Sequence, residues 1–391
     1  MKVLYIQYAG DFSEAYTRLF VEHGKENYYG QKYSVGAVVD QAQNGMDVLV
    51  VVLNSDGYSC KLTENLRSIG LTRADDKYRR MHEIIEEFEP DRVILRLPDI
   101  KILRLLRKKN IPTFPVFADS FEKMGRFRGR INKFFLSREL ANRRIRWIAN
   151  HQINASRSVE QLGVEKKKIL PYDWLHSSSP EEWSKIAATD IATKTIDIFY
   201  AGAISKAKGI YDLIQAIPCI QRSGRKATLQ IAGGGNEELT DFISSMDLEA
   251  NVTILGKISH DNVLQNMNDA DLVAVPSRHD YPEGLPMTIM ESLMVGTPVA
   301  ASDHPMFVGR VGIRGAVEFY MENNPDDIAR TILKMCSDYS DYKRRCENAA
   351  LEWHDLCLDL KWADMINAWL VDPEKCDFSE YTLASLSKAN Q

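Results

Sequence analysis

Short apolar runs alternate with amphipathic stretches along most of the chain. The first third holds four β-branched runs that predict buried parallel strands, at 3–10, 47–55, 91–98 and 111–119. Helical periodicity fills the intervals between them, at 34–45, 77–90 and 99–110. This order predicts right-handed crossovers and a doubly wound parallel sheet with helices on both faces.

The alternation stops in a polar stretch rich in Ser, Thr and Ala, and it resumes at TIDIFYAGA. We interpret the polar stretch, residues 175–194, as an interdomain linker. The predicted fold class is α/β, with two Rossmann-like, doubly wound parallel-sheet domains that face each other across a cleft. The predicted boundaries are 1–174 for the first domain, 195–365 for the second, and 366–391 for a C-terminal helix or tail that returns to the first.

The stretch EGLPMTIMESLMVGTPVAASD, residues 283–303, follows a predicted strand and begins a predicted helix at 286–295. The amino end of a helix favours an anion such as a diphosphate. Glu283 precedes this end and Glu291 lies roughly 7 Å further along the axis, at 1.5 Å per residue. A nucleotide sugar carries vicinal hydroxyls on both sides of its diphosphate, and carboxylates accept hydrogen bonds from them. The alternative is an amphipathic helix with an N-terminal acid and a solvated glutamate.

This stretch resembles the EX7E signature of retaining glycosyltransferases of the GT4 family, which have the GT-B fold. The resemblance covers most of the second domain. It implies that Glu283 contacts the donor sugar and that Glu291 contacts the nucleotide ribose. It also implies that the amides of Gly284 and Leu285 face the diphosphate or the sugar.

The string YAGAISKAKGIYDLIQA, residues 200–216, resembles a second motif of that family. Gly202 allows a tight turn at a strand end, and Lys208 offers a cation that neutralises the leaving diphosphate. The resemblance thus makes Glu283 and Lys208 the expected catalytic pair. The sequence departs from the family at Ala203, where an arginine is usual. We expect Lys206 or Arg278 to supply the missing charge.

Three further segments complete the predicted donor site. Gly233 and Gly234 end a strand and allow close approach to the nucleotide. The resemblance places backbone contacts to the base at Lys257 and Ile258. The triplet Asp269-Ala270-Asp271 spells the DxD metal motif of another glycosyltransferase fold, but it joins a helix to a strand, so capping is the favoured interpretation. No essential metal and no cofactor are expected, because the nucleoside-diphosphate sugar is a co-substrate.

The first domain is expected to bind the acceptor, a sugar or a lipid-linked sugar. Gly10 and Asp11 follow the first strand, where relatives often carry a glycine-rich loop. Asp119 and His151 follow later strands and are weak acceptor candidates. The alternative for His151 is a structural role. No Ser-His-Asp or Cys-His arrangement is evident.

Charge is distributed unevenly. The chain has a net charge of −5 and six cysteines without CxxC spacing, which favours neither nucleic-acid binding nor a disulfide or zinc framework. Residues 101–147 nevertheless hold 14 Lys or Arg against 3 Asp or Glu. Aromatic and apolar residues there could meet a membrane while the basic ones meet phosphates; they are Ile131, Phe134, Phe135, Trp147, Arg126, Arg128, Arg130, Lys133, Arg143 and Arg144. The segment would also suit a phosphorylated acceptor, such as a lipid-linked diphosphate sugar. The remaining alternative is a solvated helix whose aromatics are core.

Taken together, the sequence predicts a retaining glycosyltransferase of polysaccharide or glycolipid biosynthesis that moves a sugar from a nucleoside-diphosphate donor to an acceptor hydroxyl. It is expected to be cytoplasmic, with docking on the inner face of an anionic membrane. Two alternatives stay open, a nucleotide-sugar epimerase of the same fold and a non-catalytic glycosyltransferase-like partner. The base, the sugar, the acceptor, the linkage and the oligomeric state are not determined by the sequence.

Overall fold

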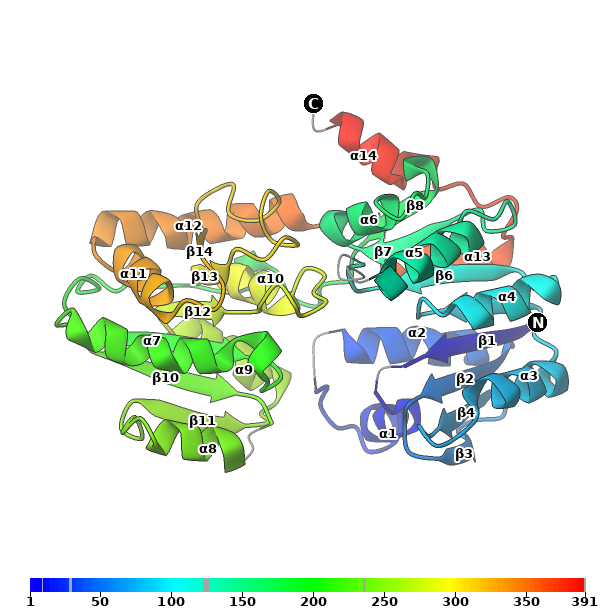
Figure 1. Ribbon diagram of the computed structural model, residues 1–391, viewed down its shortest axis with the longest axis horizontal. Coiled ribbons are helices and arrows are strands. Elements are labelled where there is room, and N and C mark those ends of the chain that lie inside the picture. Colours follow the sequence, from blue (N-terminus) through cyan, green and yellow to red (C-terminus); the bar gives the residue numbers. More distant parts are fainter. Residues whose placement is uncertain (9, 28–29, 122–126, 235–236, 390–391) are drawn as a thin grey trace. The chain divides into compact units, whose positions relative to one another are not determined.

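A computed structural model describes residues 1–391 except 9, 28–29, 122–126, 235–236 and 390–391, and the side chains of 127–131 and 388–389 are also not described. The chain divides into two compact units (Figure 1). Unit 1 combines Met1–Leu175 with Leu358–Gln391, and unit 2 is His176–Cys357. Each unit has its own sheet, so each is described by itself.

The described residues of unit 1 form an eight-stranded sheet in the order β3-β4-β2-β1-β5-β6-β7-β8. All neighbours are parallel except β3, which runs antiparallel to β4 at one edge. From β1 the chain builds outward through β2 to one edge, and it then returns to place β5 on the other side of β1. The strands are β1 (Lys2–Gln7), β2 (Asp47–Leu53), β3 (Tyr58–Lys61), β4 (Leu66–Leu71), β5 (Arg92–Leu95), β6 (Thr113–Phe117), β7 (Ile148–His151) and β8 (Ile169–Tyr172).

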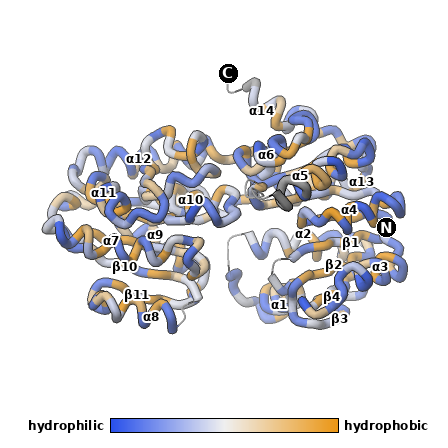
Figure 2. Tube along the Cα trace, in the orientation of Figure 1, coloured by the Kyte–Doolittle hydropathy of each residue, from blue (hydrophilic) through white to orange (hydrophobic). Residues whose placement is uncertain are grey.

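Helices cover both faces of this sheet, because successive strand residues point to opposite sides. Val3 and Tyr5 of β1 join one hydrophobic cluster, and Leu4 and Ile6 join the other. The helices are α1 (Phe12–Tyr16), α2 (Gln31–Gln43), α3 (Lys77–Phe88), α4 (Ile100–Lys108), α5 (Phe127–Leu140), α6 (Ile153–Glu160), α13 (Trp362–Val371) and α14 (Leu383–Ala389). Figure 2 shows the strands of both sheets as largely hydrophobic stretches between more hydrophilic helices and loops.

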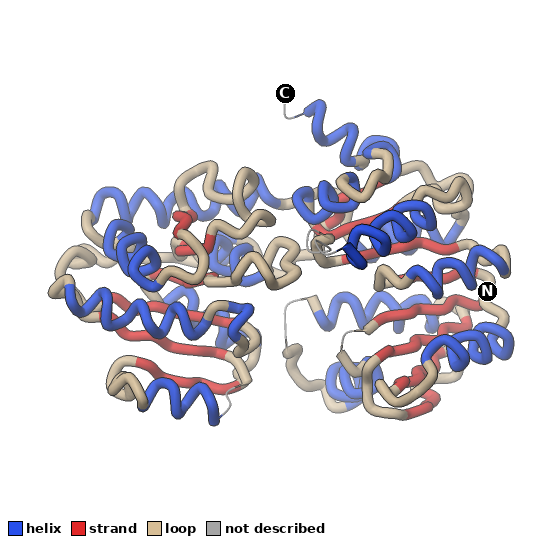
Figure 3. The backbone as a smooth tube through the Cα atoms, in the orientation of Figure 1, coloured by secondary structure: helices blue, strands red, loops and turns tan. Residues whose placement is uncertain are grey.

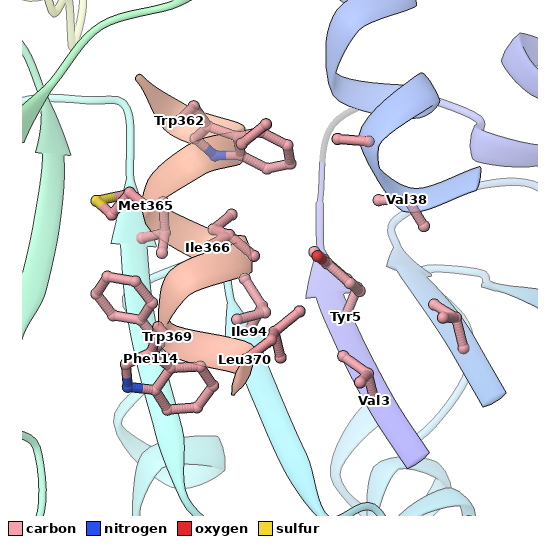
Figure 4. Packing of buried hydrophobic residues seen from close by; sticks show 14 of the residues in the cluster. Val3, Tyr5, Val38, Ile94, Phe114, Trp362, Met365, Ile366, Trp369 and Leu370 are labelled. Carbon is pink, nitrogen blue, oxygen red and sulfur yellow. The ribbon is translucent and has the colours of Figure 1, made fainter. Parts of the chain in front are cut away.

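The helix α13 belongs to the core of unit 1 although it is far from the other elements in sequence. Its buried side chains point towards β1, β5 and β6 (Figure 4). The ring of Trp369 lies 5.3 Å from that of Phe114 on β6. Backbone hydrogen bonds fix the return of the chain, from Asp173 N–H to Leu360 and from Trp362 N–H to Asp173, both 2.9 Å long.

The described residues of unit 2 form a six-stranded, fully parallel sheet in the order β11-β10-β9-β12-β13-β14. Helices again pack on both of its faces (Figure 3). The strands are β9 (Ile196–Ala201), β10 (Ala227–Ala232), β11 (Val252–Gly256), β12 (Leu272–Val275), β13 (Val299–Ser302) and β14 (Val317–Tyr320). The helices are α7 (Ile210–Arg222), α8 (Glu237–Ser244), α9 (His260–Asp269), α10 (Met287–Met294), α11 (Pro325–Met335) and α12 (Tyr339–Leu356).

The predicted fold class of two doubly wound α/β domains is confirmed, with one departure, since the edge strand β3 is antiparallel. The boundaries in the structure differ from the predicted ones. Most of the stretch interpreted as a linker packs into unit 2: Ile191 is fully buried there, and Lys185 donates to the carbonyls of Asn268 and Ala270. The chain re-enters unit 1 at Leu358, earlier than the expected boundary after residue 365.

The basic segment 101–147 is partly built into the fold. Arg104 and Arg107 on α4 both bind the buried carboxylate of Glu139 on α5, at 2.8 and 2.9 Å. Phe135 packs beneath Arg104, and Phe134 is 64% exposed. The expectation that Trp147 meets an interface is wrong, because its side chain is buried in the core.

Among the other residues expected at this surface, Arg143 and Arg144 near the end of the segment are exposed, whereas Lys133 is only partly exposed. Arg126 lies outside the described residues, and so do the side chains of Arg128, Arg130 and Ile131. None of the helices built from described residues is both long and apolar enough to span a bilayer.

Candidate functional site

The strand order of unit 2 reverses between β9 and its neighbour β12. In open α/β sheets, ligands bind beyond the carboxyl ends of the strands at such a point. The residues that follow β9 are Gly202 to Gly209, and those that follow β12 lead through Ser277 and Glu283 into α10. The structure therefore brings the two strongest sequence motifs to one crevice of this unit.

Glu283 is buried and directly paired with Lys208. Its Oε1 accepts from Lys208 Nζ at 2.5 Å and from Ser277 Oγ at 2.6 Å. The Lys208 ammonium also lies 4.3 Å from the ring centroid of Tyr281, which offers it a cation–π contact. The carboxylate and the ammonium thus neutralise each other in a site that excludes most water.

The turn that carries Lys208 is fixed on both sides. Ser205 caps it by accepting from Lys208 N–H at 3.2 Å, and Gly209 ends it with a φ of 71°. A Cβ at Gly209 would stand 1.9 Å from the carbonyl oxygen of Pro276, so only glycine allows this close approach to the loop after β12. Glycine at 209 is therefore required to position the lysine.

Glu291 lies on α10 and is buried. Its Oε1 is 2.7 Å from Nε2 of His260, the first residue of α9, which is also buried. This hydrogen bond fixes the direction of the carboxylate and leaves its second oxygen for a ligand. The two glutamates therefore each have a dedicated partner, a lysine for the first and a histidine for the second.

The helix α10 starts one residue later than expected, with Pro286 as its N-cap. Its first backbone N–H groups have no partner within the helix. Within the described chain, no hydrogen bond is donated by the backbone N–H of Gly284, Leu285, Met287 or Thr288. These donors and the positive end of the helix dipole favour an anion beside Glu283.

The ends of β9, β10 and β11 approach one another closely. Gly202 N–H donates to Ala232, and Gly233 N–H donates to Gly256. A Cβ at Gly233 would lie 2.2 Å from the Gly202 carbonyl oxygen, so a side chain there has no room. Gly234 and the exposed Lys257 lie next to this edge, and Ile258 packs partly into the core.

The surroundings of Ala203 show whether Lys206 or Arg278 replaces the arginine that is usual in the family. The buried Tyr200 donates to the Ala203 carbonyl oxygen at 2.7 Å, and burial, with the nearby Glu283 charge, raises the pKa of this tyrosine. Neither expected substitute cation contacts Glu283 in the described chain. Arg278 forms a bidentate pair with Asp212, at 2.6 and 2.8 Å, which raises its pKa, and the Lys206 side chain is 77% exposed. Lys208 is thus the cation that contacts Glu283.

The DxD triplet is structural, but its role is not the expected capping alone. The buried Asp271 accepts from Lys194 Nζ at 2.8 Å and from Asp197 N–H at 2.8 Å. Asp269 ends α9 and accepts from Gln265. The triplet therefore ties the start of β12 to the start of β9.

Sequence reasoning missed four residues that support the site, namely His260, Ser277, Tyr281 and His304. His304 is buried, and its Nδ1 accepts from Met306 N–H while its Nε2 lies 3.1 Å from the Tyr281 carbonyl. Burial lowers the pKa of His304, so the neutral ring is the form that donates to the loop. No local motif marks these residues: the partners of His260 and His304 lie 31 and 23 residues away, and Ser277 and Tyr281 stand in a loop with no regular periodicity.

The four candidates of the first domain do not form one cluster in unit 1. Gly10, with a φ of 74°, and Asp11, the N-cap of α1, line two cavities at the carboxyl end of β1. Asp119 accepts from Tyr8 OH. His151 is buried against Tyr172 and Trp174, with Nε2 3.8 Å from Asp173, which agrees with the structural alternative.

Residues 181–353, nearly all of unit 2, match the family described as glycosyl transferases group 1. Unit 2 is a group 1 glycosyl transferase domain. All the predicted donor-site residues, from Gly202 to Glu291, lie inside the matched range of this glycosyl transferase domain.

Individual proteins agree with this assignment. The alpha-D-kanosaminyltransferase of Streptomyces kanamyceticus is 32% identical over 108 residues. This match spans 27% of the present chain and 27% of the length of that relative. The fold extends further than the sequence similarity. A sucrose-phosphate synthase from Thermosynechococcus elongatus matches 96% of this chain and 99% of its own with a TM-score of 0.66, at 13% identity.

Anabaena HepE, solved with UDP and glucose, matches 96% of this chain and 100% of its own with a TM-score of 0.64, at 16% identity. These likenesses concern the fold, which is that of GT-B glycosyltransferases.

Proposed function

We propose that this protein is a retaining glycosyltransferase that moves a sugar from a nucleoside diphosphate to an acceptor hydroxyl, in the synthesis of a polysaccharide or glycolipid. The observation that carries the proposal is the buried Glu283–Lys208 pair at the β9/β12 switch point, beside the amino end of α10. The glycosyl transferase domain at 181–353 supports it. The complex of HepE with UDP and glucose supports this class of donor for a chain of the same fold.

The proposed roles follow from the contacts. The diphosphate lies at the amino end of α10, where Gly284 and Leu285 offer N–H groups, and Lys208 neutralises it as it leaves. Glu283 holds hydroxyls of the transferred sugar. Glu291, oriented by His260, holds the ribose hydroxyls. The base lies along the glycine-rich edge near Lys257.

Retention needs no separate protein base in this scheme. The bond between the anomeric carbon and the diphosphate oxygen breaks while the acceptor oxygen approaches the same face. A diphosphate oxygen takes the acceptor proton, so the products are the glycoside and the protonated nucleoside diphosphate. The protein contributes alignment and charge stabilisation, by Lys208 and the α10 amides.

A thermal-shift screen with UDP, GDP and ADP, followed by their sugars, tests the donor class. A ligand selective for the folded state adds RT ln(1 + [L]/Kd) to the free energy of unfolding, which raises the unfolding midpoint. We expect one nucleoside diphosphate to raise the midpoint clearly, and its sugar to be consumed with release of that diphosphate. If no nucleotide shifts the midpoint, the donor assignment is wrong.

Product analysis separates this function from its two alternatives. An epimerase converts the nucleotide sugar without an acceptor and without releasing the diphosphate. A non-catalytic partner releases no diphosphate from any donor, and its cellular phenotype is unchanged by Glu283→Ala. NMR of the anomeric proton in the glycoside decides between retention and inversion.

The same proposal places the enzyme in the cytoplasm against an anionic membrane through the segment 101–147. The exposed Phe134 and its basic neighbour Lys133 support this placement. Co-sedimentation with vesicles that contain the anionic lipid phosphatidylglycerol is expected for the wild type and weaker for Phe134→Ser. Equal binding to neutral vesicles would contradict it.

A further inference from the structure

Unit 1 has its own topological switch point, which the proposed donor site does not use. The chain reverses direction across the sheet between β1 and β5, and these strands are direct neighbours. Gln7 ends β1, and Arg96 follows β5 with its N–H donating to the Ile6 carbonyl at 2.8 Å. These two side chains therefore stand together where an open α/β sheet binds ligands.

Arg96 is held firmly but is not neutralised. Its Nη1 donates to the Gln7 amide oxygen at 2.8 Å, and its guanidinium lies 5.2 Å from the ring centroid of the buried Trp362. In the described parts of unit 1, no carboxylate lies within ion-pairing distance of Arg96. A partly buried arginine fixed by an amide and an indole keeps donors available, and it favours a planar or tetrahedral oxyanion.

A cavity of about 50 Å³ lies in front of Arg96. Its polar lining includes Arg96 and Gln7, with Gln31 and Ser34 from the first turn of α2, and the remaining wall is mostly apolar. A single water needs about 10–15 Å³ when the volume is that open to the centre of a water-sized sphere. The cavity therefore admits a polar group larger than one water. It shares Gly10 and Asp11 with a wider, open cavity of about 440 Å³, which has room for a sugar ring.

The start of α2 adds to the positive character of this cavity. Its N-cap, Gly30, has left-handed backbone and no side chain to accept from the first N–H groups. Gln31 uses its amide oxygen to accept from Arg18 and Asn27, which leaves its NH₂ group to donate. The Glu26 carboxylate already accepts from Lys32 N–H and offsets part of the positive helix end, so Arg96 is the main cation for an anion in this cavity.

One acid, Asp11, is among the lining residues, and it is already engaged. Its Oδ1 accepts from Glu14 N–H at 3.0 Å as the cap of α1. It can still accept from a sugar hydroxyl, since a carboxylate has more than one acceptor site. The cavity therefore combines a cation for an anion with an acceptor for hydroxyls.

We propose that the Arg96 cavity is an oxyanion subsite, which binds a carboxylate or phosphate group on the acceptor while its sugar ring occupies the wider cavity. This inference rests on the proposed function, in which the group bound by unit 1 is the acceptor of the glycosyl transfer. Arg96, Gln7 and the first turn of α2 hold the anion, and Asp11 binds a hydroxyl of the ring. The acceptor class is then an acidic sugar, either a uronic acid or a sugar phosphate.

Three matched probes test the subsite, namely glucose, glucuronate and glucose 6-phosphate, which differ only at C6. Binding is measured by calorimetry with the donor site filled by UDP, GDP or ADP, whichever raises the unfolding midpoint. We expect an anionic probe to bind at least about tenfold more tightly than glucose, as charged hydrogen bonds usually contribute. A preference for glucuronate indicates a uronic acid, and one for glucose 6-phosphate indicates a phosphorylated acceptor.

The variant Arg96→Gln should abolish this preference, while Arg67→Gln should keep it. Arg67→Gln is a matched control because it also removes one cation from unit 1. In the wild type, Arg67 pairs with Asp47 at the start of β2. Arg96→Lys keeps the charge without the planar fork, and it should retain part of the preference. Thermal unfolding reports whether Arg96→Gln lowers the folded fraction. If it does, the binding preference of Arg96→Lys decides the test instead.

Equal binding of all three probes overturns the proposal, and so does a failure of both anionic probes to bind. Equal weakening by Arg96→Gln and Arg67→Gln also overturns it, because it would reflect net charge alone. These results would leave donor binding untouched. If no nucleoside diphosphate binds but glucuronate still binds through Arg96, the proposed transferase function fails and the anion site stands.

Discussion

The two units of this protein repeat one architecture but treat charge at their switch points differently. In unit 2 the crevice between β9 and β12 contains a carboxylate and an ammonium, Glu283 and Lys208, 2.5 Å apart. In unit 1 the crevice between β1 and β5 contains Arg96, which is held by an amide and an indole. A ligand must therefore share an existing ion pair in one unit, whereas it supplies the missing anion in the other.

Under the proposed function, this difference would let one fold divide two binding tasks. A donor brings both an anion for Lys208 and hydroxyls for Glu283, so the buried pair can exchange one partner for another without leaving a bare charge. Leaving such a charge buried is costly. An acidic acceptor brings an anion to Arg96, which has no carboxylate partner among the described residues, and its hydroxyl meets a separate acid, Asp11. The units also differ in how they complete their cores, because unit 1 includes α13 from the distant segment that follows unit 2.

The largest expected effect concerns that core. Trp369→Ala removes a buried ring that packs on Phe114, and it should destabilise unit 1 by about 3–5 kcal/mol. Differential scanning calorimetry should show the transition of unit 1 at a lower temperature. Trp353→Ala, in α12, is the matched change in unit 2 and should move the other transition. A single transition that both variants move equally would show that the units unfold together.

Glu283→Gln tests the paired switch point. It keeps the shape but removes the charge opposite Lys208, and we expect the rate of nucleoside diphosphate release to fall by about 100-fold or more. Affinity for the free nucleoside diphosphate should not fall, since this glutamate is assigned to the sugar and its neutralisation leaves Lys208 to pair with the diphosphate. Glu347→Gln removes an exposed carboxylate of unit 2 and should leave the rate unchanged. An unaltered rate in Glu283→Gln would refute the assigned role.

His260→Ala tests whether the histidine positions Glu291. Losing a hydrogen bond to a charged group should weaken nucleoside diphosphate binding by about tenfold, with a smaller effect on turnover. The specific readout is discrimination against a 2′,3′-dideoxy nucleotide, which should shrink in the variant and recover in His260→Gln. His354→Ala, which breaks an exposed His–Glu pair with Glu181, is the control. If discrimination against the dideoxy nucleotide is unchanged in His260→Ala, His260 has a packing role and does not position Glu291.

The smallest expected effect is a pH dependence of unit 2. Burial lowers the pKa of His304 below its usual 6.5, with the Tyr281 carbonyl and the charges of Glu283 and Glu322 opposing the shift and His279 adding to it. The unfolded chain therefore binds this proton first, so stability is full above about pH 6.5 and declines as the pH falls towards the folded pKa. His304→Gln, which keeps a donor for Tyr281, should lose less stability than the wild type between pH 7.5 and 5.5. Equal slopes in urea titrations would count against this.

Most of the fold could be predicted because its strands are continuous apolar runs. The runs at 47–55 and 91–98 became β2 and β5 at nearly the expected positions. The missed strands, β3, β4 and β14, alternate exposed and buried residues or are short. The stretch 175–194 was misassigned because its few apolar residues, such as Ile191, show no periodicity although they are buried.

The candidate site could be predicted only where a motif is contiguous. Glu283 and Glu291 lie within one string, and the structure adds their partners from 75 and 31 residues away. Such pairing depends on which strand ends meet, and local sequence does not encode that. Arg278 illustrates the limit, because its position near the site was correct but Asp212 binds its guanidinium. Arg96 lies in no recognised motif. Its position at a switch point follows only from the pairing of β1 with β5.

The return of residues 358–391 to unit 1 also has a consequence for the order of events at the ribosome. Trp362 and Trp369 belong to the centre of unit 1, yet they are translated after every residue of unit 2. Domains usually fold as they emerge, with the N-terminal one first. Unit 2 can therefore fold before unit 1 is complete. The sheet of unit 1 stays partly uncovered until α13 and α14 have been synthesised.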